Sequence, residues 1–592
     1  MELVPGIKLA VQTVLAEKYH YRIDIQDVLV NETKAEFKGD YTVVLFSFSK
    51  TLKTSPDILG KVLGDALLAS HPDWFADFNV IKGFLNLVIA EGVLLDFLHL
   101  HFNNPTYGAQ PANGRRVMVE YSSPNTNKPL HLGHLRNNFL GWSVAAMYQS
   151  SGYEIVKTCI ANDRGIHICK SMVAWNLFGH GATPETTGIK GDHFVGDYYV
   201  FFGNELKKQV QAGINAGQSR ELAEKESPLM KAAQQMLVDW EAGKPEVLEL
   251  WQKMNSWVYE GFDVTYRRIG SDFDKIYYES QTYLLGKDLV EMGLQNKVFF
   301  KKDDGSVWID LTPDGLDEKI VQRSDGTAVY MTQDIGLADE KYKEFHPELS
   351  IYVVADEQNY HFKVLKLICQ KLDLPSALGI YHLSYGLVEL PSGRMKTREG
   401  TVVDADDIID EMTGIAAQHT EELGKVPDFS EEERKELYDI IGLGALKFFL
   451  LRVDPKKRMV FNPEESIDFH GYTGPFVQYT FARIKSILRK ESVAEYPSNE
   501  MTPLLPLEKE LLVTLEKYSG LLQLACLEMN PSLIANYAFN IAKLFNSFYA
   551  EHSVSRAESE SKKQLRLRIC MMTAGVIHSS MQLLGIRVPE RM

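Results

Sequence analysis

The stretch SSPNTNKPLHLGHLRN, residues 122–137, places two histidines three positions apart, with a glycine between them and a lysine shortly before. The apolar residues ahead of it predict a strand over 115–121, and the periodic residues behind it predict a helix over about 134–150. A second strand is predicted over 153–160. This βαβ order indicates that the stretch joins a strand of a parallel sheet to the following helix.

A tight turn of this kind favours phosphate, because it presents free backbone N–H groups and the positive end of the helix dipole. It also lies at the carboxyl edge of the sheet, where open α/β folds bind ligands. The imidazoles of His131 and His134 can donate hydrogen bonds to a polyphosphate, and Lys128 adds a positive charge. Gly133 leaves room for a flat base against the backbone. The turn is therefore predicted to bind a nucleotide.

Two other interpretations of the histidine pair stay open at this point. An HxxH pattern in an arbitrary sequence more often packs or caps a helix than binds a ligand. A metal-binding pair needs further ligands, and none is evident nearby, so we expect no structural metal. The glycine-rich phosphate loops are excluded, because no Gly-Lys pair is followed by Ser or Thr, and GLGALK at 442–447 lacks the third glycine of a dinucleotide fingerprint.

Composition restricts the class of protein. The chain has 592 residues, enough for three or more domains, and 45% of them are hydrophobic. Its formal net charge of -16 argues against a nonspecific polyanion binder, although the segment from Phe476 onward carries 14 basic and 11 acidic residues and is compatible with an anionic partner. Five scattered cysteines without a CxxC pair are typical of a protein in the reducing environment of the cytoplasm. We expect no secretory signal, and no stretch approaches the ~18 apolar residues of a membrane span.

Three domains are predicted along the chain. Residues 1–112 are expected to form an α/β unit, which ends in the linker NNPTYGAQPANG at 103–114. Residues 113–429 are expected to form an α/β core with a parallel sheet, interrupted by a mostly helical insertion at about 180–290. Residues 430–592 are expected to be all-α.

Further signals support this division. Strand patterns resume after the insertion at 349–356 and 381–390. Ser430 and Glu433 predict a capping box at the start of the first C-terminal helix. Periodic helical segments then follow at 436–452, 475–490, 506–527, 531–549 and 563–584.

The motif HLGH behind VEYSSPNTNKPL resembles the HIGH signature of class I aminoacyl-tRNA synthetases, and the whole string is similar to its form in the arginyl-tRNA synthetase family. Other stretches resemble landmarks of that family in the same order. They are DGTAVYMTQDIG (325–336), YVVADEQNYHF (352–362), GRMKTREGTVV (393–403), TGPFVQYTFARIKSIL (473–488) and the terminal PERM (589–592). The resemblance extends over essentially the full chain.

The resemblance implies a fold and an activity. The fold would be a class I synthetase Rossmann-like parallel-sheet core with a helical insertion, an N-terminal α/β additional domain that binds tRNA and a C-terminal all-α anticodon-binding domain. The reaction would join L-arginine to the 2′-hydroxyl of the terminal adenosine of tRNA(Arg) through an arginyl-adenylate made from ATP. ATP would carry Mg²⁺ as part of the substrate, and the enzyme would be a monomer that requires tRNA to activate arginine.

The second signature is implied at 394–397, where RMKT stands in place of the KMSK of many class I enzymes. Such a basic loop holds the β- and γ-phosphates as pyrophosphate leaves. Thr397 replaces the last lysine, and Lys128 is implied to substitute for it. A solvated charged loop is the alternative. The catalytic residues implied are Lys128, His131, His134, Lys396 and Arg398, and the ATP-binding residues are His131, Gly133, His134, His361, Met395 and Lys396.

Arginine recognition requires carboxylates, because a guanidinium offers a planar fork of donors that a carboxylate meets with both oxygens. The resemblance implies Asp334 as the guanidinium ligand, with Tyr330 one helical turn before it. An ordinary surface pair is the alternative for these two, and a core position is the alternative for His361. The full set of implied arginine-binding residues is Glu120, Ser123, Asn125, Tyr330, Asp334 and Gln358.

The resemblance also implies contacts with tRNA. KGFLN at 82–86 is similar to the piece that meets the D-loop corner, where Phe84 would stack on an unpaired base and Asn86 would form a hydrogen bond. A buried strand is the alternative for this piece, and packing within a helical bundle is the alternative for Tyr479. Tyr479, Arg483 and Met592 match positions that face the anticodon loop.

Two other functions compete with this interpretation. A small-molecule nucleotidylyltransferase also uses an HxGH turn, but it does not need a helical C-terminal third. A catalytically silent, tRNA-binding paralogue would be expected to have lost HLGH, Lys128 or Asp334, and all of these are present.

Overall fold

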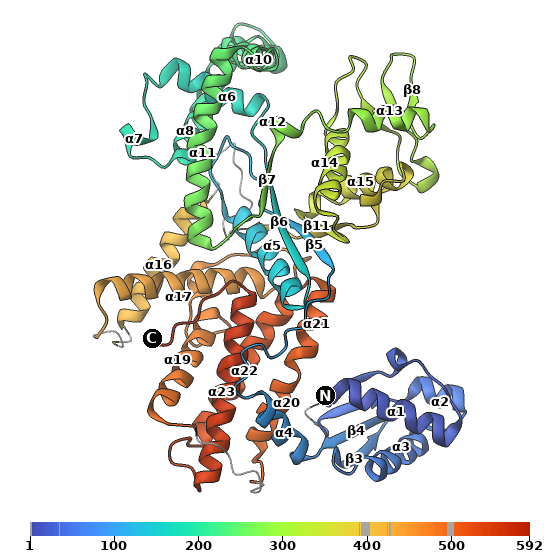
Figure 1. Ribbon diagram of the computed structural model, residues 1–592. Coiled ribbons are helices and arrows are strands. Elements are labelled where there is room, and N and C mark those ends of the chain that lie inside the picture. The colour runs from blue at the N-terminus through green and yellow to red at the C-terminus, as the bar shows by residue number, and fades with distance from the viewer. Residues whose placement is uncertain are drawn as a thin grey trace.

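A computed structural model describes residues 3–34, 36–389, 391, 403–422, 424, 428–493 and 502–592. Figure 1 shows an N-terminal unit set to one side, a central core, two lobes above the core and a helical bundle below it. Met395, Lys396 and Arg398 lie outside the described residues. No described helix is long and apolar enough to cross a membrane.

The N-terminal unit packs helices on one face of an antiparallel sheet. The strand order is β1-β2-β4-β3, and the apolar side of α1 is buried from Leu3 to Leu15. The strands are β1 Val30–Glu32, β2 Tyr41–Val44, β3 Phe75–Ile81 and β4 Phe84–Ile89. The helices are α1 Leu3–Tyr19, α2 Phe46–Leu52, α3 Pro56–Ser70 and α4 Glu91–His101.

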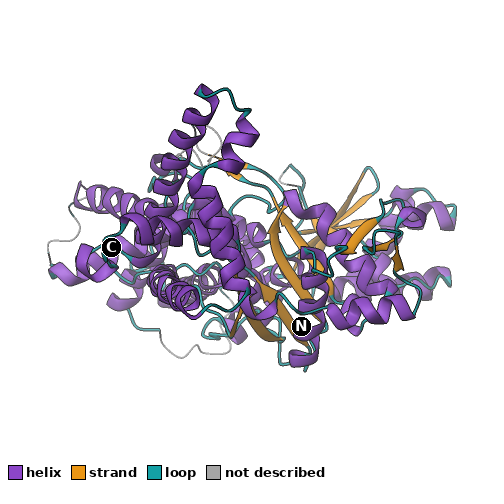
Figure 2. Cartoon of the chain, turned by 90° about the horizontal axis from the view of Figure 1, so that it is seen from above, coloured by secondary structure: helices purple, strands orange, loops and turns teal. Residues whose placement is uncertain are grey.

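The core is a five-stranded sheet in the order β12-β11-β5-β6-β7, and every neighbouring pair is parallel. Figure 2 shows it enclosed by helices, as the near-continuous apolar run of its central strand requires. The strands are β5 Arg116–Glu120, β6 Glu154–Ala161, β7 Lys275–Tyr278, β11 Leu349–Ala355 and β12 Ile380–Tyr385. Helix α5, Leu132–Ser150, joins β5 to β6.

The helical insertion differs from the expectation at both ends, because its helices occupy 166–269 and β7 then returns to the sheet. β7 has four residues and pairs only at the sheet edge, so it leaves little periodic signal in the sequence. The helices are α6 Ile166–Phe178, α7 Pro184–Thr187, α8 Gly191–Asn215, α9 Arg220–Glu226, α10 Pro228–Glu241 and α11 Pro245–Ile269.

A second lobe follows β7, and its small antiparallel sheet β10-β9-β8 was not expected from the sequence. Its strands have two to four residues each, too short for a clear alternation. The elements are α12 Glu279–Thr282, α13 Lys287–Gln295, β8 Phe300–Lys301, β9 Val307–Ile309, β10 Lys319–Gln322, α14 Tyr330–Phe345 and α15 Asn359–Lys371.

Among its described residues, the C-terminal third is helical apart from one short strand. The predicted capping box is confirmed, because the Glu433 backbone N–H donates to Ser430 Oγ at 3.2 Å and the Ser430 N–H donates to Glu433 Oε2 at 2.7 Å. Strands β13 Val388–Glu389 and β14 Met459–Val460 form a parallel pair. The helices are α16 Ala405–Glu422, α17 Glu431–Leu451, α18 Pro463–Ser466, α19 Gly474–Lys490, α20 Pro506–Glu516, α21 Tyr518–Glu528, α22 Pro531–Glu551 and α23 Glu560–Leu583.

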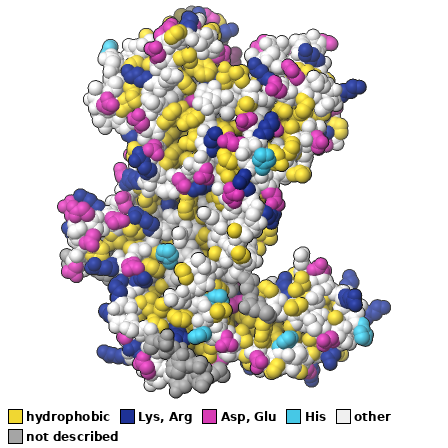
Figure 3. Space-filling model, viewed as in Figure 1, with side chains coloured by type: hydrophobic (Ala, Val, Ile, Leu, Met, Phe, Trp, Pro, Cys, Tyr) yellow, Lys and Arg dark blue, Asp and Glu magenta, His cyan; other side chains and the backbone are white. Residues whose placement is uncertain are grey.

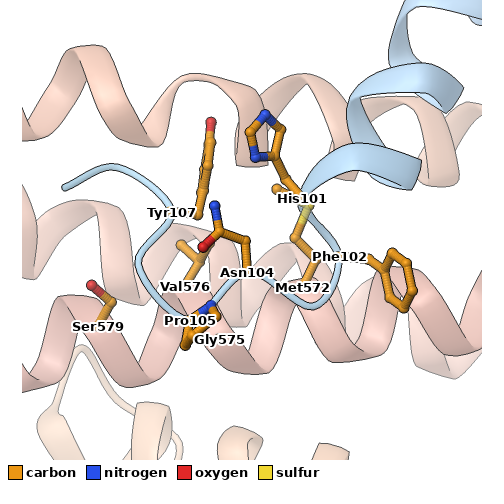
Figure 4. Close-up of a pocket in the computed structure, with 9 residues that line it drawn as sticks. All are labelled: His101, Phe102, Asn104, Pro105, Tyr107, Met572, Gly575, Val576 and Ser579. Carbon is orange, nitrogen blue, oxygen red and sulfur yellow. The ribbon is translucent and has the colours of Figure 1, made fainter. Parts of the chain in front are cut away.

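The N-terminal unit is attached to this bundle by polar contacts and by the linker. Glu516 of α20 accepts the Leu3 backbone N–H at 2.7 Å and the Tyr41 hydroxyl at 2.5 Å. The Tyr107 hydroxyl donates to the Glu516 carbonyl at 2.8 Å. Figure 4 shows the linker lying against α23, where Asn104, Pro105 and Tyr107 line a small pocket together with Met572 and Val576 of that helix. The N-terminal unit is therefore positioned by the bundle rather than by the core.

The surface carries charges of both signs. Figure 3 shows Lys and Arg side chains interspersed with Asp and Glu over the face in view. The acidic side chains on that face do not form one continuous patch, although the whole chain has a net charge of -16. An anionic partner would therefore meet local groups of basic side chains there.

Candidate active site

The chain reverses sharply after β5. Ser122 and Ser123 have φ angles of 74° and 47°, in the left-handed region that costs non-glycine residues conformational energy. Asn137 on α5 holds this conformation, because its Oδ1 accepts the Ser122 N–H at 2.5 Å and its Nδ2 donates to the Val353 carbonyl of β11 at 2.7 Å. The turn after β5 is thus bonded through Asn137 to both α5 and β11.

His131 and His134 cap α5 and orient each other. His131 Nδ1 accepts the Gly133 N–H at 3.1 Å, and His134 Nδ1 accepts the His131 N–H at 3.1 Å. The two ring centroids are 3.9 Å apart. A ring nitrogen that accepts a hydrogen bond carries no hydrogen, so each neutral ring has its proton on Nε2. The capping interpretation and the ligand-binding interpretation are therefore compatible, since they use opposite nitrogens of the same rings.

Burial keeps both imidazoles neutral. It lowers the pKa of His131 to about 3, with a smaller contribution from the charge of Lys128. It also lowers the pKa of His134 well below the usual value for histidine. At neutral pH the turn therefore offers two uncharged Nε2–H donors at the positive end of the α5 dipole. The expected free backbone N–H groups are not found at Leu132 and Gly133, because both are used within the fold.

Lys128 lies in the HLGH turn, the name used here for residues 128–134. Burial lowers the pKa of its ammonium group. A cavity of about 210 Å³ opens beside it, between the turn and helix α8. The lining residues include Lys128, His131, His193, Asp197, Tyr199 and Asp404.

The segment that follows the second signature is bonded to the HLGH turn. The Leu132 N–H donates to the Val403 carbonyl at 3.2 Å, and the Ala405 N–H donates to the Leu130 carbonyl at 3.0 Å. His131 and Asp404 form an antiparallel bridge between these bonds. Two stretches more than 250 residues apart in the sequence thus meet at one site.

A group of acidic side chains lies around the start of α14. Asp334 Oδ2 is 2.6 Å from His361 Nε2, so two residues expected to bind different substrates are in contact. The sequence analysis missed Glu279, a half-buried carboxyl group that directly follows β7. Burial raises its pKa to about 7; the charge of Arg164 opposes this shift, and those of Asp163 and Asp334 add to it. The available signal was its position directly after a strand, but that strand was itself missed.

Glu120 lies at the end of β5, where the chain enters the site. It is buried, and its Oε2 pairs with Lys341, which is also buried, on α14. The sequence analysis expected its charge to face the substrate, whereas the structure engages one of its oxygens inside the fold.

The other expected arginine-binding residues lie on three neighbouring segments. The Ser123 carbonyl accepts from Asn162 Nδ2 at 3.3 Å, and Asn125 is exposed and bridges Asn162. Tyr330 begins α14 and is exposed. Gln358 is exposed at the turn between β11 and α15. These segments follow or flank the carboxyl ends of β5 and β11, as the predicted sheet edge requires.

The residues expected to meet tRNA in the N-terminal unit behave differently from each other. Phe84 begins β4, and its ring packs edge to face on exposed Phe46 at 5.3 Å between centroids. Asn86 is only 1% exposed; its Oδ1 accepts from Thr42 at 2.6 Å and its Nδ2 donates to Asn79 at 2.8 Å. The expected base contact of Asn86 is therefore wrong for this conformation, because its amide is used within the sheet.

Two of the anticodon-side residues, Tyr479 and Arg483, lie together on α19 and next to α22. The Arg483 guanidinium lies 5.0 Å from the ring centroid of Tyr479 and 5.5 Å from that of Tyr549. It also donates to Asn546. Met592 is half-buried at the end of the chain. Aromatic rings beside a guanidinium can offer faces on which an unpaired base stacks.

Comparison with known proteins shows the family of the chain. A family model described as the class I (R) tRNA synthetase catalytic domain matches residues 98–462, and the DALR anticodon binding domain matches residues 477–592. A curated protein of Amoebophilus asiaticus named arginine–tRNA ligase is 50% identical over 591 residues, with 99% of each chain covered. A Flavobacterium psychrophilum protein of the same name is 51% identical and covers 100% of this chain and 99% of its own. The chain belongs to the arginyl-tRNA synthetase family.

Solved arginyl-tRNA synthetases share this fold. The enzyme from Thermus thermophilus superposes with a TM-score of 0.80 at 24% identity, and the one from Plasmodium falciparum with 0.79 at 17% identity; both pairs cover 100% of each chain. The expected Rossmann-like core and all-α C-terminal domain are confirmed. The chain is a class I aminoacyl-tRNA synthetase, so the small-molecule nucleotidylyltransferase is set aside.

Proposed function

We propose that this enzyme activates L-arginine with ATP and transfers it to the 2′-hydroxyl of the terminal adenosine of tRNA(Arg). The arginine carboxylate attacks the α-phosphorus, the bond to the bridging β-phosphate oxygen breaks, and pyrophosphate leaves. The 2′-hydroxyl then attacks the acyl carbon of the adenylate and AMP departs. Neither step needs a covalent protein nucleophile, so the protein contributes alignment and charge stabilisation.

One observation carries the phosphate part of this proposal. The two Nε2–H donors of the HLGH turn and the N-terminus of α5 belong to one short segment. Neutral donors favour a polyphosphate without holding it as tightly as two fixed cations would, which suits a site that must release pyrophosphate. In this proposal His131, Gly133, His134 and His361 bind ATP, Lys128 stabilises the leaving phosphates, and Met395, Lys396 and Arg398 complete the clamp. Mg²⁺ arrives with ATP.

The arginine part rests on Asp334. Its carboxylate accepts hydrogen bonds from the guanidinium, and Tyr330 covers the same helix face. Glu279 adds a second acidic group, close enough to Asp334 for the charge of Asp334 to raise its pKa. Ser123, Asn125 and Gln358 hold the remaining groups of the amino acid, and Glu120 supports them from the end of β5.

The tRNA part assigns one role to each terminal domain. Residues 1–112 form the additional tRNA-binding domain, with Phe84 as its stacking residue; residues 113–429 form the catalytic domain; residues 430–592 form the anticodon-binding domain. Tyr479, Arg483 and Met592 face the anticodon loop. The enzyme works as a monomer in the cytoplasm, and it activates arginine only when tRNA is bound.

The deciding experiment is arginine-dependent ATP–pyrophosphate exchange, measured with and without tRNA(Arg). The proposal expects exchange that depends on both arginine and tRNA, and esterification of the tRNA. Exchange without any arginine would instead indicate a different substrate. Binding of tRNA without exchange would indicate the silent tRNA-binding paralogue.

A further inference from the structure

Asp406, in the first turn of α16, collects hydrogen bonds from three side chains of the insertion. Its Oδ2 accepts from Lys190 Nζ at 2.7 Å and from His193 Nε2 at 3.1 Å. Its Oδ1 accepts from Thr265 Oγ1 at 3.0 Å. Lys190 precedes α8, His193 lies on α8 and Thr265 lies on α11. One carboxylate thus joins the two long insertion helices to α16.

The same turn of α16 is joined to the HLGH turn. Asp404 Oδ1 accepts the Asp406 N–H at 2.8 Å, and Asp404 bridges His131 through its backbone. The Asp404 carboxylate also lies 3.4 Å from His193 Nε2. Asp404 therefore contacts both the HLGH turn and the insertion, and Asp406 lies two positions after it.

Helix packing leaves little freedom between these parts. A Cβ atom at Gly191 would lie 1.9 Å from the Trp257 carbonyl oxygen, so α8 and α11 touch backbone to backbone. A Cβ atom at Gly196 would lie 2.7 Å from Pro129 Cδ, so α8 also rests on the HLGH turn. A displacement of α8 or α11 would therefore press on the HLGH turn directly. It would also strain the hydrogen bonds of Asp406, which join these helices to α16.

The cluster holds an internal cation rather than an open metal position. Asp192, His193 and Asp406 offer ligand atoms within 4.8 Å of one another. The Lys190 ammonium already bonds to Asp192 at 3.0 Å as well as to Asp406, and it occupies the place that an ion would take. Burial alone would raise the pKa of Asp406, but the hydrogen bonds from His193, Lys190 and Thr265 hold it well below its usual range. The carboxylate is thus charged throughout the working pH range.

We propose that Asp406 is a positioning residue for adenylate formation, which fixes the phosphate-binding HLGH turn to helices α8 and α11 of the insertion. It does not line the cavity beside Lys128 and acts through the Asp404–His131 bridge. The inference rests on the proposed function, because it assigns the ATP step to that turn.

Asp406→Asn tests the proposal, with Asp407→Asn as its matched control. Asp407 lies in the same first turn of the same helix and is exposed, so both variants remove one negative charge from that helix end. Misplacement of a reacting group by about 1 Å can lower a rate by ~10²-fold. We expect Asp406→Asn to lower pyrophosphate exchange by about 10- to 100-fold, through kcat or the KM for ATP, with the KM for arginine within about twofold of wild type.

A second variant, Thr265→Val, keeps the test informative if Asp406→Asn folds poorly, and a double variant tests the coupling if it folds well. Thr265→Val removes one donor and no charge, and should shift the ATP parameters in the same direction by less. Lys190→Met combined with Asp406→Asn should be less impaired than the two single effects added together, because both remove the Lys190–Asp406 contact.

The outcomes separate this inference from the proposed function. If wild type shows no arginine-dependent exchange, the proposed function fails. If wild type is active but Asp406→Asn matches Asp407→Asn, or raises both KM values equally, or adds fully to Lys190→Met, the positioning role is overturned.

Discussion

The Nδ1 atom of His134 accepts the backbone N–H of His131 at 3.1 Å. This single bond caps α5 and at the same time assigns the proton of His134 to Nε2, the nitrogen left for a ligand. The side chain at position 134 therefore has two functions. One of its atoms must accept a hydrogen bond, and another atom, about two bonds farther out, must donate one. Histidine meets both with one rigid ring.

Two substitutions of His134 test the donor at Nε2. Asn can accept near the Nδ1 position but has no group at Nε2, whereas Gln at this N3 position can offer its oxygen to the His131 N–H and place its amide N–H near Nε2. We expect His134→Asn to unfold at nearly the wild-type temperature and to lose adenylate formation by about 10²-fold. His134→Gln should retain more exchange than His134→Asn at a similar unfolding temperature. Exchange that is slower in Gln than in Asn would contradict the assignment of the donor.

Asp334→Asn tests the guanidinium site. The amide oxygen can still accept from His361, so the local fold should persist, but the charge that meets the guanidinium is gone. Hydrogen bonds to charged groups contribute roughly 1.5–3 kcal/mol, so the KM for arginine should rise by about 10- to 100-fold while that for ATP changes little. Glu340→Gln, an exposed acid on the same helix, is the control. Equal rises in both KM values would reject the role of Asp334.

Glu279 predicts a pH dependence of arginine binding. Its pKa is raised to about 7, first by burial, so the free enzyme loses this negative charge as the pH falls through 7. The KM for arginine should therefore rise between pH 8 and pH 6, by up to about tenfold per pH unit at the acid end. The KM for ATP should not follow it, and Glu279→Gln should flatten the curve. A wild-type KM for arginine that is constant over this range would show that Glu279 does not face the guanidinium.

Lys447 predicts a pH dependence of stability. Burial, with the nearby charge of Arg587, lowers its pKa from 10.5 to about 7, while its Nζ donates to the Gly585 carbonyl at 2.6 Å. Between these values the unfolded chain binds a proton that the folded chain does not, so stability should rise with pH from 7 upward by at most about 1.4 kcal/mol per unit. Below pH 7 both states are protonated and this group adds no slope.

Thermal unfolding of wild type and Lys447→Met at pH 7 and pH 9 measures this effect. The wild-type midpoint should gain on that of the variant between the two pH values, whereas exposed Lys435→Met should track wild type. A parallel shift of Lys447→Met and wild type would mean that the lysine is charged in the folded protein.

Local patterns in the sequence predicted much of the core and the helical third. The strand expected at 115–121 is β5, and the capping box at Ser430 is present as predicted. Both depend on neighbours within a few residues, which a linear pattern contains. The helix expected over 506–527 is broken at Lys517 into α20 and α21, where no proline or glycine marks the break.

Contacts between distant segments could not be predicted in the same way. Asp334 and His361 are 27 residues apart, and the sequence gives no sign that they touch. The burial of Asn86 depends on Thr42, which is 44 residues earlier. Glu279 was missed because β7 has four residues at a sheet edge and little alternation. Hydrogen bonds between polar side chains that are far apart in the sequence produce no periodic pattern in it.

A crystal structure with arginine and a non-hydrolysable ATP analogue tests the central claim most directly. The claim is that the triphosphate lies on the HLGH turn beside an acidic pocket for the guanidinium. We predict phosphate oxygens within hydrogen-bond distance of Nε2 of His131 and His134, and the guanidinium of arginine against Asp334. Phosphates bound away from both imidazoles, or a guanidinium that meets no carboxylate of α14, would contradict it.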